Sequence, residues 1–239
     1  MAVMLRDYQS QAIWDVRVAF KKVRAVILVL ATGAGKTVIF SEITRLAKEK
    51  GSRVLILAHR DQLIKQSSRK LTDIGTTHGI IMAAHPVAWH EMVQVGSVQT
   101  VVRRLDKFIA PPDIIIIDEC HLSAAKTYRT ILNNFPNAKV LGVTGSPCRL
   151  DGRPLGRDPN AKKPEDTGLF DAMVQGISIK QLMERQFLVP IRMFGPSQKL
   201  NLEGISSQAR DYNQKELSER MDTPTISGDA IAQYRRICP

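Results

Sequence analysis

Residues 25–37 read Ala-Val-Ile-Leu-Val-Leu-Ala-Thr-Gly-Ala-Gly-Lys-Thr, and this stretch indicates the fold of the chain. Its first six residues are an aliphatic run typical of a buried strand, and a helical pattern begins at Lys36. A strand, a glycine-containing loop and a helix in this order are the setting of a phosphate-binding loop. Gly33 and Gly35 allow a tight turn in which successive amides can face one anion.

The end of this loop carries side chains that suit a nucleoside triphosphate. Lys36 can reach the β- and γ-phosphates, the Thr37 hydroxyl can ligate magnesium, and the helix N-terminus adds partial positive charge. The loop departs from the general pattern, because Leu30 stands where Gly or Ala is usual. The residues predicted to bind the nucleotide here are Thr32, Gly33, Ala34, Gly35, Lys36 and Thr37.

A second motif, Asp-Glu-Cys-His at residues 118–121, follows the aliphatic run Ile114–Ile117. Asp118 is therefore expected at the carboxyl end of a strand, the edge at which open parallel sheets bind ligands. Taken alone, these four residues could also be a solvated acidic turn. The presence of both motifs in one chain favours a nucleotide site.

Strands and helices alternate as far as about residue 145, which predicts an α/β fold. Fully apolar strands indicate a mostly parallel sheet with helices on both faces. We expect strands at 24–30, 53–58, 80–83, 93–98, 114–117, 140–144 and 188–194. Helices are expected at 9–22, 36–50, 61–74, 100–108, 179–186 and 213–221. The proline-rich, charged stretch 149–168 is predicted to be an exposed loop.

The composition restricts the kind of protein and its partners. The chain has 239 residues and a formal net charge of +11, concentrated in residues 1–110, which hold 17 Lys and Arg against 8 Asp and Glu. This excess suggests a polyanionic partner such as nucleic acid, although a soluble basic face without a partner is the alternative. No run approaches a membrane span, and three cysteines without a C-x-x-C spacing suit a reducing compartment, so we expect a cytoplasmic protein.

The order of the motifs resembles the N-terminal RecA-like motor domain of superfamily 2 helicases and translocases, in particular the DEAH/DECH-type DNA enzymes. The resemblance extends over most of residues 4–194. The segments that carry it are Leu5-Arg6-Asp7-Tyr8-Gln9, Ala31–Thr37, Ala58-His59-Arg60, Gly96–Thr100, Asp118–His121 and Val143-Thr144-Gly145-Ser146-Pro147.

The resemblance implies a role for each motif. Gln9 matches the glutamine that reads adenine. Asp118 would hold magnesium together with Thr37, since a hard cation prefers oxygen ligands. Glu119 would orient the attacking water, and Lys36 and His121 complete the catalytic set. His121 would couple the γ-phosphate site to Thr144 and Ser146.

Four further positions would line the nucleic-acid face in this family, namely His59, Arg60, Gln99 and Thr100. Groups of this kind suit contacts with phosphates, which hold a strand without reading its sequence. For Thr100 alone, helix capping is an alternative role. The expected partner is DNA, with RNA not excluded.

The family motor needs two RecA-like domains with ATP between them. We expect residues 1–196 to be the ATP-binding domain and residues 197–239 a polar tether toward a second, absent domain. The expected function is the ATP-binding half of a nucleic-acid-stimulated ATPase, a DNA helicase or translocase, with ATP and magnesium as cofactors. The alternatives are an ATP-switched nucleic-acid-binding module and the translocase subunit of a restriction complex.

Overall fold

The structure is a computed structural model that describes residues 4–83, 85–122, 126–148, 154–161, 163, 167–190, 204, 206–208, 211–221, 231–232 and 234–236. The chain divides into two compact units, residues 1–188 and 189–239, which are treated separately. The predicted domain boundary at residue 196 lies outside the described residues.

Seven parallel strands form one sheet in the larger unit, in the order β3-β4-β2-β5-β6-β1-β7. β1, β2 and β4 are buried along their whole length, and β5 and β6 at every residue but the first, as expected when helices cover both faces. This confirms the predicted α/β fold. The strands are β1 Ala25–Val29, β2 Val54–Ala58, β3 Gly79–Ile81, β4 Val93–Ser97, β5 Ile114–Asp118, β6 Lys139–Thr144 and β7 Ala172–Gln175.

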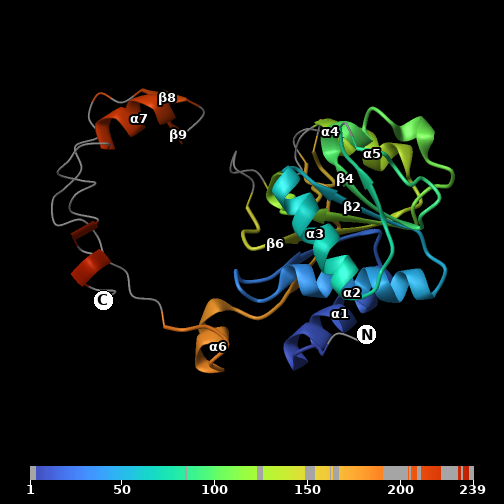
Figure 1. Cartoon of the computed structure of the whole chain (residues 1–239), viewed down its shortest axis with the longest axis horizontal. Helices are drawn as coiled ribbons and strands as arrows, with labels where there is room; N and C mark the ends of the chain where they lie inside the picture. Colours follow the sequence, from blue (N-terminus) through green and yellow to red (C-terminus); the bar gives the residue numbers. More distant parts are fainter. Residues whose placement is uncertain are drawn as a thin grey trace. The chain divides into compact units, whose positions relative to one another are not determined.

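Helices cover the two faces of this sheet (Figure 1). On one face, α1 (Asp7–Phe20), α2 (Lys36–Glu49) and α3 (Asp61–Asp73) pack on alternate strand residues such as Leu28 and Ile56. On the other, α4 (Val98–Val101) and α5 (Lys126–Asn134) pack on the residues between them, such as Ile27 and Leu55. The two hydrophobic layers fix the sheet, and with it the loops at the carboxyl ends of the strands.

The structure differs from the predicted elements at three places, and for the strand at 188–194 only residues 188–190 can be compared. The helix expected at 100–108 is only α4 followed by a 3₁₀ turn at Leu105–Lys107. Helix α5 was not predicted. The strand expected at 188–194 is absent from its described part, residues 188–190, and the seventh strand is instead β7, which precedes α6 (Ile179–Glu184).

The position of β7 at the edge of the sheet explains why it was missed. In the part of the chain that the structure describes, β7 pairs only with β1, and its residues Ala-Met-Val-Gln are partly or largely exposed. Val174 packs on the core, whereas Met173 is 59% exposed. An edge strand can therefore lack the continuous apolar run by which the other strands were recognised.

The predicted loop 149–168 is described only at 154–161, 163 and 167–168. Most of these residues are exposed, but Leu155 is buried against Phe170 and Leu169. Isolated bridges join Cys148 to Pro154 and Gly156 to Phe170. This stretch is thus partly fastened to the core.

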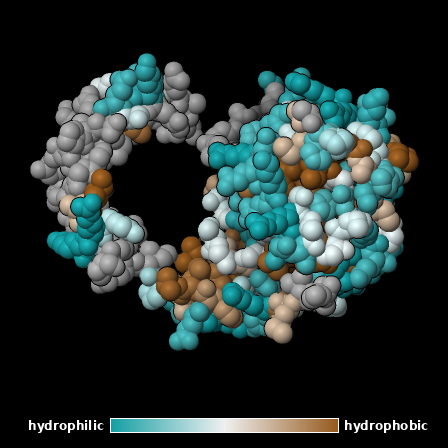
Figure 2. All heavy atoms as spheres, in the orientation of Figure 1, coloured by the Kyte–Doolittle hydropathy of each residue, from teal (hydrophilic) through white to brown (hydrophobic). Residues whose placement is uncertain are grey.

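The described residues of the smaller unit include a two-stranded antiparallel pair and a helix, with further helical residues at 231–232 and 234–236. The pair is β8 (Ser207–Gln208) and β9 (Asp211–Tyr212), and the helix is α7 (Gln214–Met221), close to the predicted helix 213–221. Among the described residues of the whole chain, no helix has the length and apolar character needed to span a membrane. On the visible face of the larger unit, hydrophilic residues predominate, and hydrophobic ones gather around α6 (Figure 2).

Candidate nucleotide site

The predicted phosphate loop connects β1 to α2 and has the backbone that the sequence indicates. Gly33 and Gly35 have φ angles of 85° and 81°, in the left-handed region that side chains disfavour. Gly35 is the N-cap of α2, so Lys36 and Thr37 stand in its first turn. Thr32 and Gly33 are exposed while Ala34 is buried, which leaves one side of the loop open to a ligand. The unsatisfied amides at the start of α2 suit an anion.

The second motif lies directly beside this loop. Lys36 Nζ is 3.1 Å from Glu119 Oε1, and His121 Nδ1 is 3.3 Å from Glu119 Oε2. His121 Nδ1 is also 3.0 Å from Thr144 Oγ1. The structure therefore brings together three of the predicted catalytic residues and the predicted coupling residue Thr144, which come from three different segments.

The order and register of the strands explain why these four side chains lie together. β1, β6 and β5 are neighbours in parallel register, and Asp118 lies opposite Val143, so the residues after both strands emerge at the same edge. Glu119 has a φ of 49°, which is unusual for a residue with a side chain. Such strain persists where the surrounding structure holds it, and here the carboxylate is held by Lys36 and His121.

Asp118 lies behind Glu119 and is 6% exposed. Its Oδ1 accepts a hydrogen bond from the Glu119 amide at 3.0 Å. Burial, reinforced by the neighbouring Glu119 carboxylate, raises the pKa of Asp118 to about 6. A buried carboxylate of this kind suits a magnesium ion, which would restore the charge balance, with Thr37 as a second oxygen donor.

The predicted coupling segment is joined to this cluster through Thr144. Thr144 Oγ1 donates to the Ser146 carbonyl at 3.1 Å and accepts from the Ser146 amide at 3.1 Å. Thr144 thus contacts His121 by its side chain, whereas Ser146 is connected through its backbone. The Ser146 side chain is exposed.

Gln9 is 5% exposed and lies under the loop. Its Nε2 donates to the Ala34 carbonyl at 3.2 Å, and its Oε1 accepts from the Arg6 amide at 3.0 Å. The amide orientation is therefore fixed beside the loop. The adenine-reading role of Gln9 stays a prediction.

The predicted nucleic-acid residues follow two neighbouring strands, β2 and β4, in which Ala58 pairs with Ser97. His59 Nδ1 and Gln99 Nε2 are 3.1 Å apart, and Ser97 Oγ donates to Gln99 Oε1 at 2.7 Å. Arg60 is exposed and Thr100 is half-buried. The four positions share one sheet edge, and their contact with nucleic acid stays a prediction.

Two residues at the loop were not predicted as site residues. The Tyr8 hydroxyl donates to the Ala34 carbonyl at 3.2 Å. A Cβ at Gly145 would lie 3.2 Å from Lys36 Nζ, so glycine allows the close approach of the Thr144–Ser146 turn to the lysine. Tyr8 adjoins Gln9 and Gly145 lies between the two coupling residues, but only the structure shows that both touch the loop.

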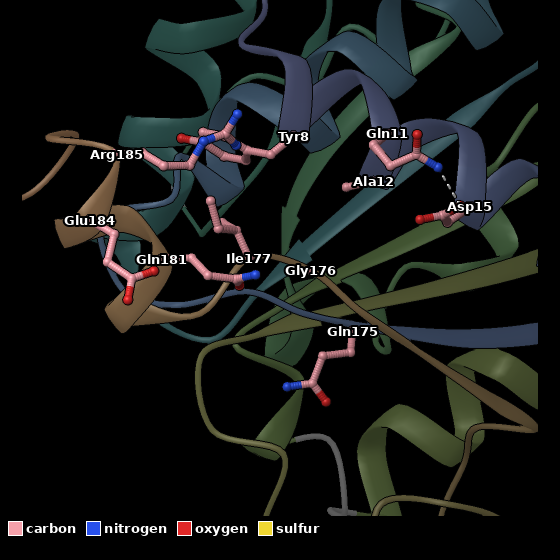
Figure 3. A pocket seen from close by; sticks show the side chains of 10 residues that line it. All are labelled: Tyr8, Gln11, Ala12, Asp15, Gln175, Gly176, Ile177, Gln181, Glu184 and Arg185. Carbon is pink, nitrogen blue, oxygen red and sulfur yellow. Dashed lines mark hydrogen bonds between the residues drawn. The ribbon is translucent and has the colours of Figure 1, made fainter.

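A pocket of about 500 Å³ opens between α1 and α6, and Tyr8 and Arg185 are among the residues that line it (Figure 3). Gln11 donates to Asp15 at 2.9 Å along its α1 wall. The carboxylates of Asp15 and Glu184 line this pocket, and they would repel a triphosphate. The phosphates are therefore better accommodated by the loop itself.

Cys120 is fully buried in the layer beneath the site. Burial raises the pKa of its thiol well above the ordinary value, which keeps it protonated. The structure thus favours a packing role over a nucleophilic one.

Comparison with known proteins identifies the family. Residues 2–149 match the family model ResIII, described as "Type III restriction enzyme, res subunit". A 51.5 kDa protein of Lactococcus phage (isolate 7-9) is 32% identical over 203 residues, covering 84% of this chain and 39% of the relative. The chain spans between 35 and 39% of the length of the first curated relatives that it matches.

Solved structures support the same fold. A nuclease-deletion mutant of the Type ISP restriction-modification enzyme LlaGI, in complex with a DNA substrate mimic, aligns with a TM-score of 0.58 and 20% identity, covering 77% of this chain and 21% of that one. The UvsW helicase of bacteriophage T4 aligns with a TM-score of 0.54 and 23% identity, covering 72% and 60%. The chain therefore belongs to the ResIII family and contains the N-terminal RecA-like motor domain of superfamily 2 helicases and translocases.

Proposed function

We propose that this chain is the ATP-binding half of a DNA-stimulated ATPase of the helicase or translocase type. The observation that supports it most is the continuous set of contacts from Lys36 through Glu119 and His121 to Thr144. A lysine for the phosphates and a carboxylate for the attacking water, joined to a segment outside the phosphate site, are the parts that triphosphate hydrolysis coupled to movement requires.

In this proposal each side chain has a defined task. The loop amides and Lys36 bind the phosphates of ATP. Asp118 and Thr37 hold magnesium, which would neutralise charge on the phosphate oxygens. Glu119 positions the attacking water and accepts its proton. His121 contacts both Glu119 and Thr144, so a change at the γ-phosphate would alter the position of Thr144. Gln9 binds the adenine base.

DNA is the proposed partner because of the basic first half of the chain and the polar groups after β2 and β4. A second motor domain is proposed to cover the open side of the loop and to supply the arginine that stabilises the transition state. The family description supports a more specific candidate, the translocase subunit of a restriction complex. Recovery of a nuclease in a stable complex with this protein would support that candidate.

Titration with a fluorescent ATP analogue and magnesium tests the nucleotide site. The wild-type chain should bind the analogue, and Lys36→Ala should abolish measurable affinity without changing the circular dichroism spectrum. Lys107→Ala, at an exposed position, is the matched control. Unchanged affinity in a folded Lys36→Ala variant would contradict the proposal.

A further inference from the structure

The carbonyl of Ala34, in the middle of the phosphate loop, accepts two side-chain hydrogen bonds. Tyr8 Oη and Gln9 Nε2 both donate to it, each at 3.2 Å. In a trans peptide the C=O of one residue and the N–H of the next point in opposite directions. Because the Ala34 oxygen is held toward α1, the Gly35 amide is directed away from α1, toward the side on which a phosphate can bind.

The Tyr8 hydroxyl is itself held from its other side. Arg6 Nη1 donates to Tyr8 Oη at 3.2 Å, so the hydroxyl accepts from a cation while it donates to Ala34. A donor to the hydroxyl oxygen strengthens the bond that the hydroxyl makes, because successive hydrogen bonds polarise one another. Tyr8 is 8% exposed, which limits competition by water.

Phe187 supports both of these residues. The Arg6 guanidinium lies 4.2 Å from the centre of the Phe187 ring, and the Tyr8 and Phe187 rings are 5.5 Å apart. Such cation–π and tilted aromatic contacts have preferred geometries, so they limit the positions of Arg6 and Tyr8. Arg185, from the same turn as Phe187, also forms a salt bridge with Asp7.

Backbone hydrogen bonds hold the turn that carries Phe187. After α6, the Phe187 amide donates to the Leu182 carbonyl at 2.8 Å and the Gln186 amide to the Met183 carbonyl at 3.0 Å. This is the pattern of a helix end closed by a left-handed residue, here Gln186 with a φ of 58°. Leu182 is fully buried, so the turn, and with it Phe187, is anchored to the core.

We propose that Tyr8 is a positioning residue of the phosphate loop, supported by Phe187 and Arg6. It acts on the triphosphate rather than on the base, because it orients the Gly35 amide through the Ala34 carbonyl. The proposal rests on the proposed nucleotide site and adds to it a role for residues outside the loop. It extends the function of the first motif from base recognition to the shape of the phosphate cradle.

The test compares ATP with magnesium tripolyphosphate, which carries the phosphates without a base. Both probes compete with a fluorescent ATP analogue in equilibrium titrations. Removing one neutral hydrogen bond by Tyr8→Phe should weaken both probes by a similar factor, about fivefold. Phe187→Ala should lower the affinity for both probes. Phe187→Tyr, which keeps an aromatic ring, should bind both probes as the wild type does. Tyr234→Phe, at a 67% exposed tyrosine, is the matched control and should leave both affinities unchanged.

Amide hydrogen exchange of the unliganded protein provides a second measurement, which does not depend on ligand binding. In Tyr8→Phe, amides of residues 33–36 should exchange faster than in the wild type, while those of β5 and β6 are unchanged. If Tyr8→Phe unfolds the chain, the titrations and the amide exchange are repeated with Phe187→Leu. This variant keeps an apolar side chain but lacks the ring, and it should show the same changes.

The possible results distinguish a failure of the role proposed for Tyr8 from a failure of the proposed nucleotide site. Wild-type affinity of Tyr8→Phe for tripolyphosphate would overturn the inference, and weaker binding of ATP alone would assign Tyr8 to base recognition instead. A wild-type chain that binds neither probe would contradict the proposed function itself.

Discussion

Replacing Asp118 by asparagine should stabilise the unliganded protein at neutral and alkaline pH. The carboxylate is 6% exposed and its pKa is raised from 3.8 to about 6, chiefly by burial. The folded state therefore binds more protons than the unfolded state between these two values, and stability falls as pH rises through them. Asparagine cannot ionise, yet its side-chain oxygen can still accept the bond from the Glu119 amide.

The size of the effect follows from the shift in pKa. One pKa unit corresponds to about 1.4 kcal/mol, so a shift of roughly two units gives about 3 kcal/mol at pH 8 as an upper limit. The same linkage gives about 1 kcal/mol at pH 4.5, where the unfolded carboxyl is only partly protonated. The advantage of the variant should thus grow with pH and level off above the folded pKa.

Urea unfolding followed by circular dichroism at pH 4.5, 6 and 8, with EDTA present, measures this difference. Asp106→Asn, at a side chain that is 72% exposed, is the control and should change stability little at any pH. A constant difference between Asp118→Asn and the wild type across this range would refute the argument, and so would a less stable variant at pH 8. Magnesium should stabilise the wild type in the presence of nucleotide and have less effect on the variant.

Three further predictions concern hydrolysis, partner binding and a strained turn. In a protein that also carries the proposed second motor domain, Glu119→Gln should keep ATP affinity within a few-fold while lowering DNA-stimulated phosphate release by about 10²-fold or more, and equal turnover of the two proteins would remove Glu119 from the mechanism. Binding to labelled single-stranded DNA, measured by anisotropy, should weaken steeply with rising salt and differ little between sequences, whereas a flat salt response would contradict the proposed phosphate contacts. Gln186→Gly should raise the free energy of unfolding by about 0.5–1 kcal/mol, because glycine adopts the left-handed conformation without strain, and thermal unfolding would show a lower melting temperature if this reasoning is wrong.

The sequence predicted the central part of the fold because its strands carry a strong and simple signal. Residues 54–58 and 114–117 are uninterrupted aliphatic runs, and both became fully or mostly buried parallel strands. Residues 172–175 lack that signal because no described strand lies beyond β7 and two of its four residues are exposed. Helix α5 was missed because it is short and mostly polar. Only Tyr128, Ile131 and Leu132 form its buried face, which is too little for a clear periodic pattern.

Within the candidate site, the sequence identified residues but not their connections. Lys36 and Glu119 were assigned separately, and their 3.1 Å contact follows only from the adjacency of β1, β6 and β5. The contact between Tyr8 and Ala34 joins residues 26 positions apart in the chain. No local pattern contains such information, since it depends on how α1 packs across the start of α2.

The ion pair between Lys36 and Glu119 has a consequence for the timing of catalysis. In the proposed function, the carboxylate that would activate water is paired with the lysine that would bind phosphate. A triphosphate that attracts Lys36 would release Glu119 in the same event, so the base would become available together with its substrate. A smaller anion that does not reach Lys36 would leave the pair intact. Two side chains that follow strands on either side of β6 would thus limit hydrolysis to the time when a triphosphate is bound.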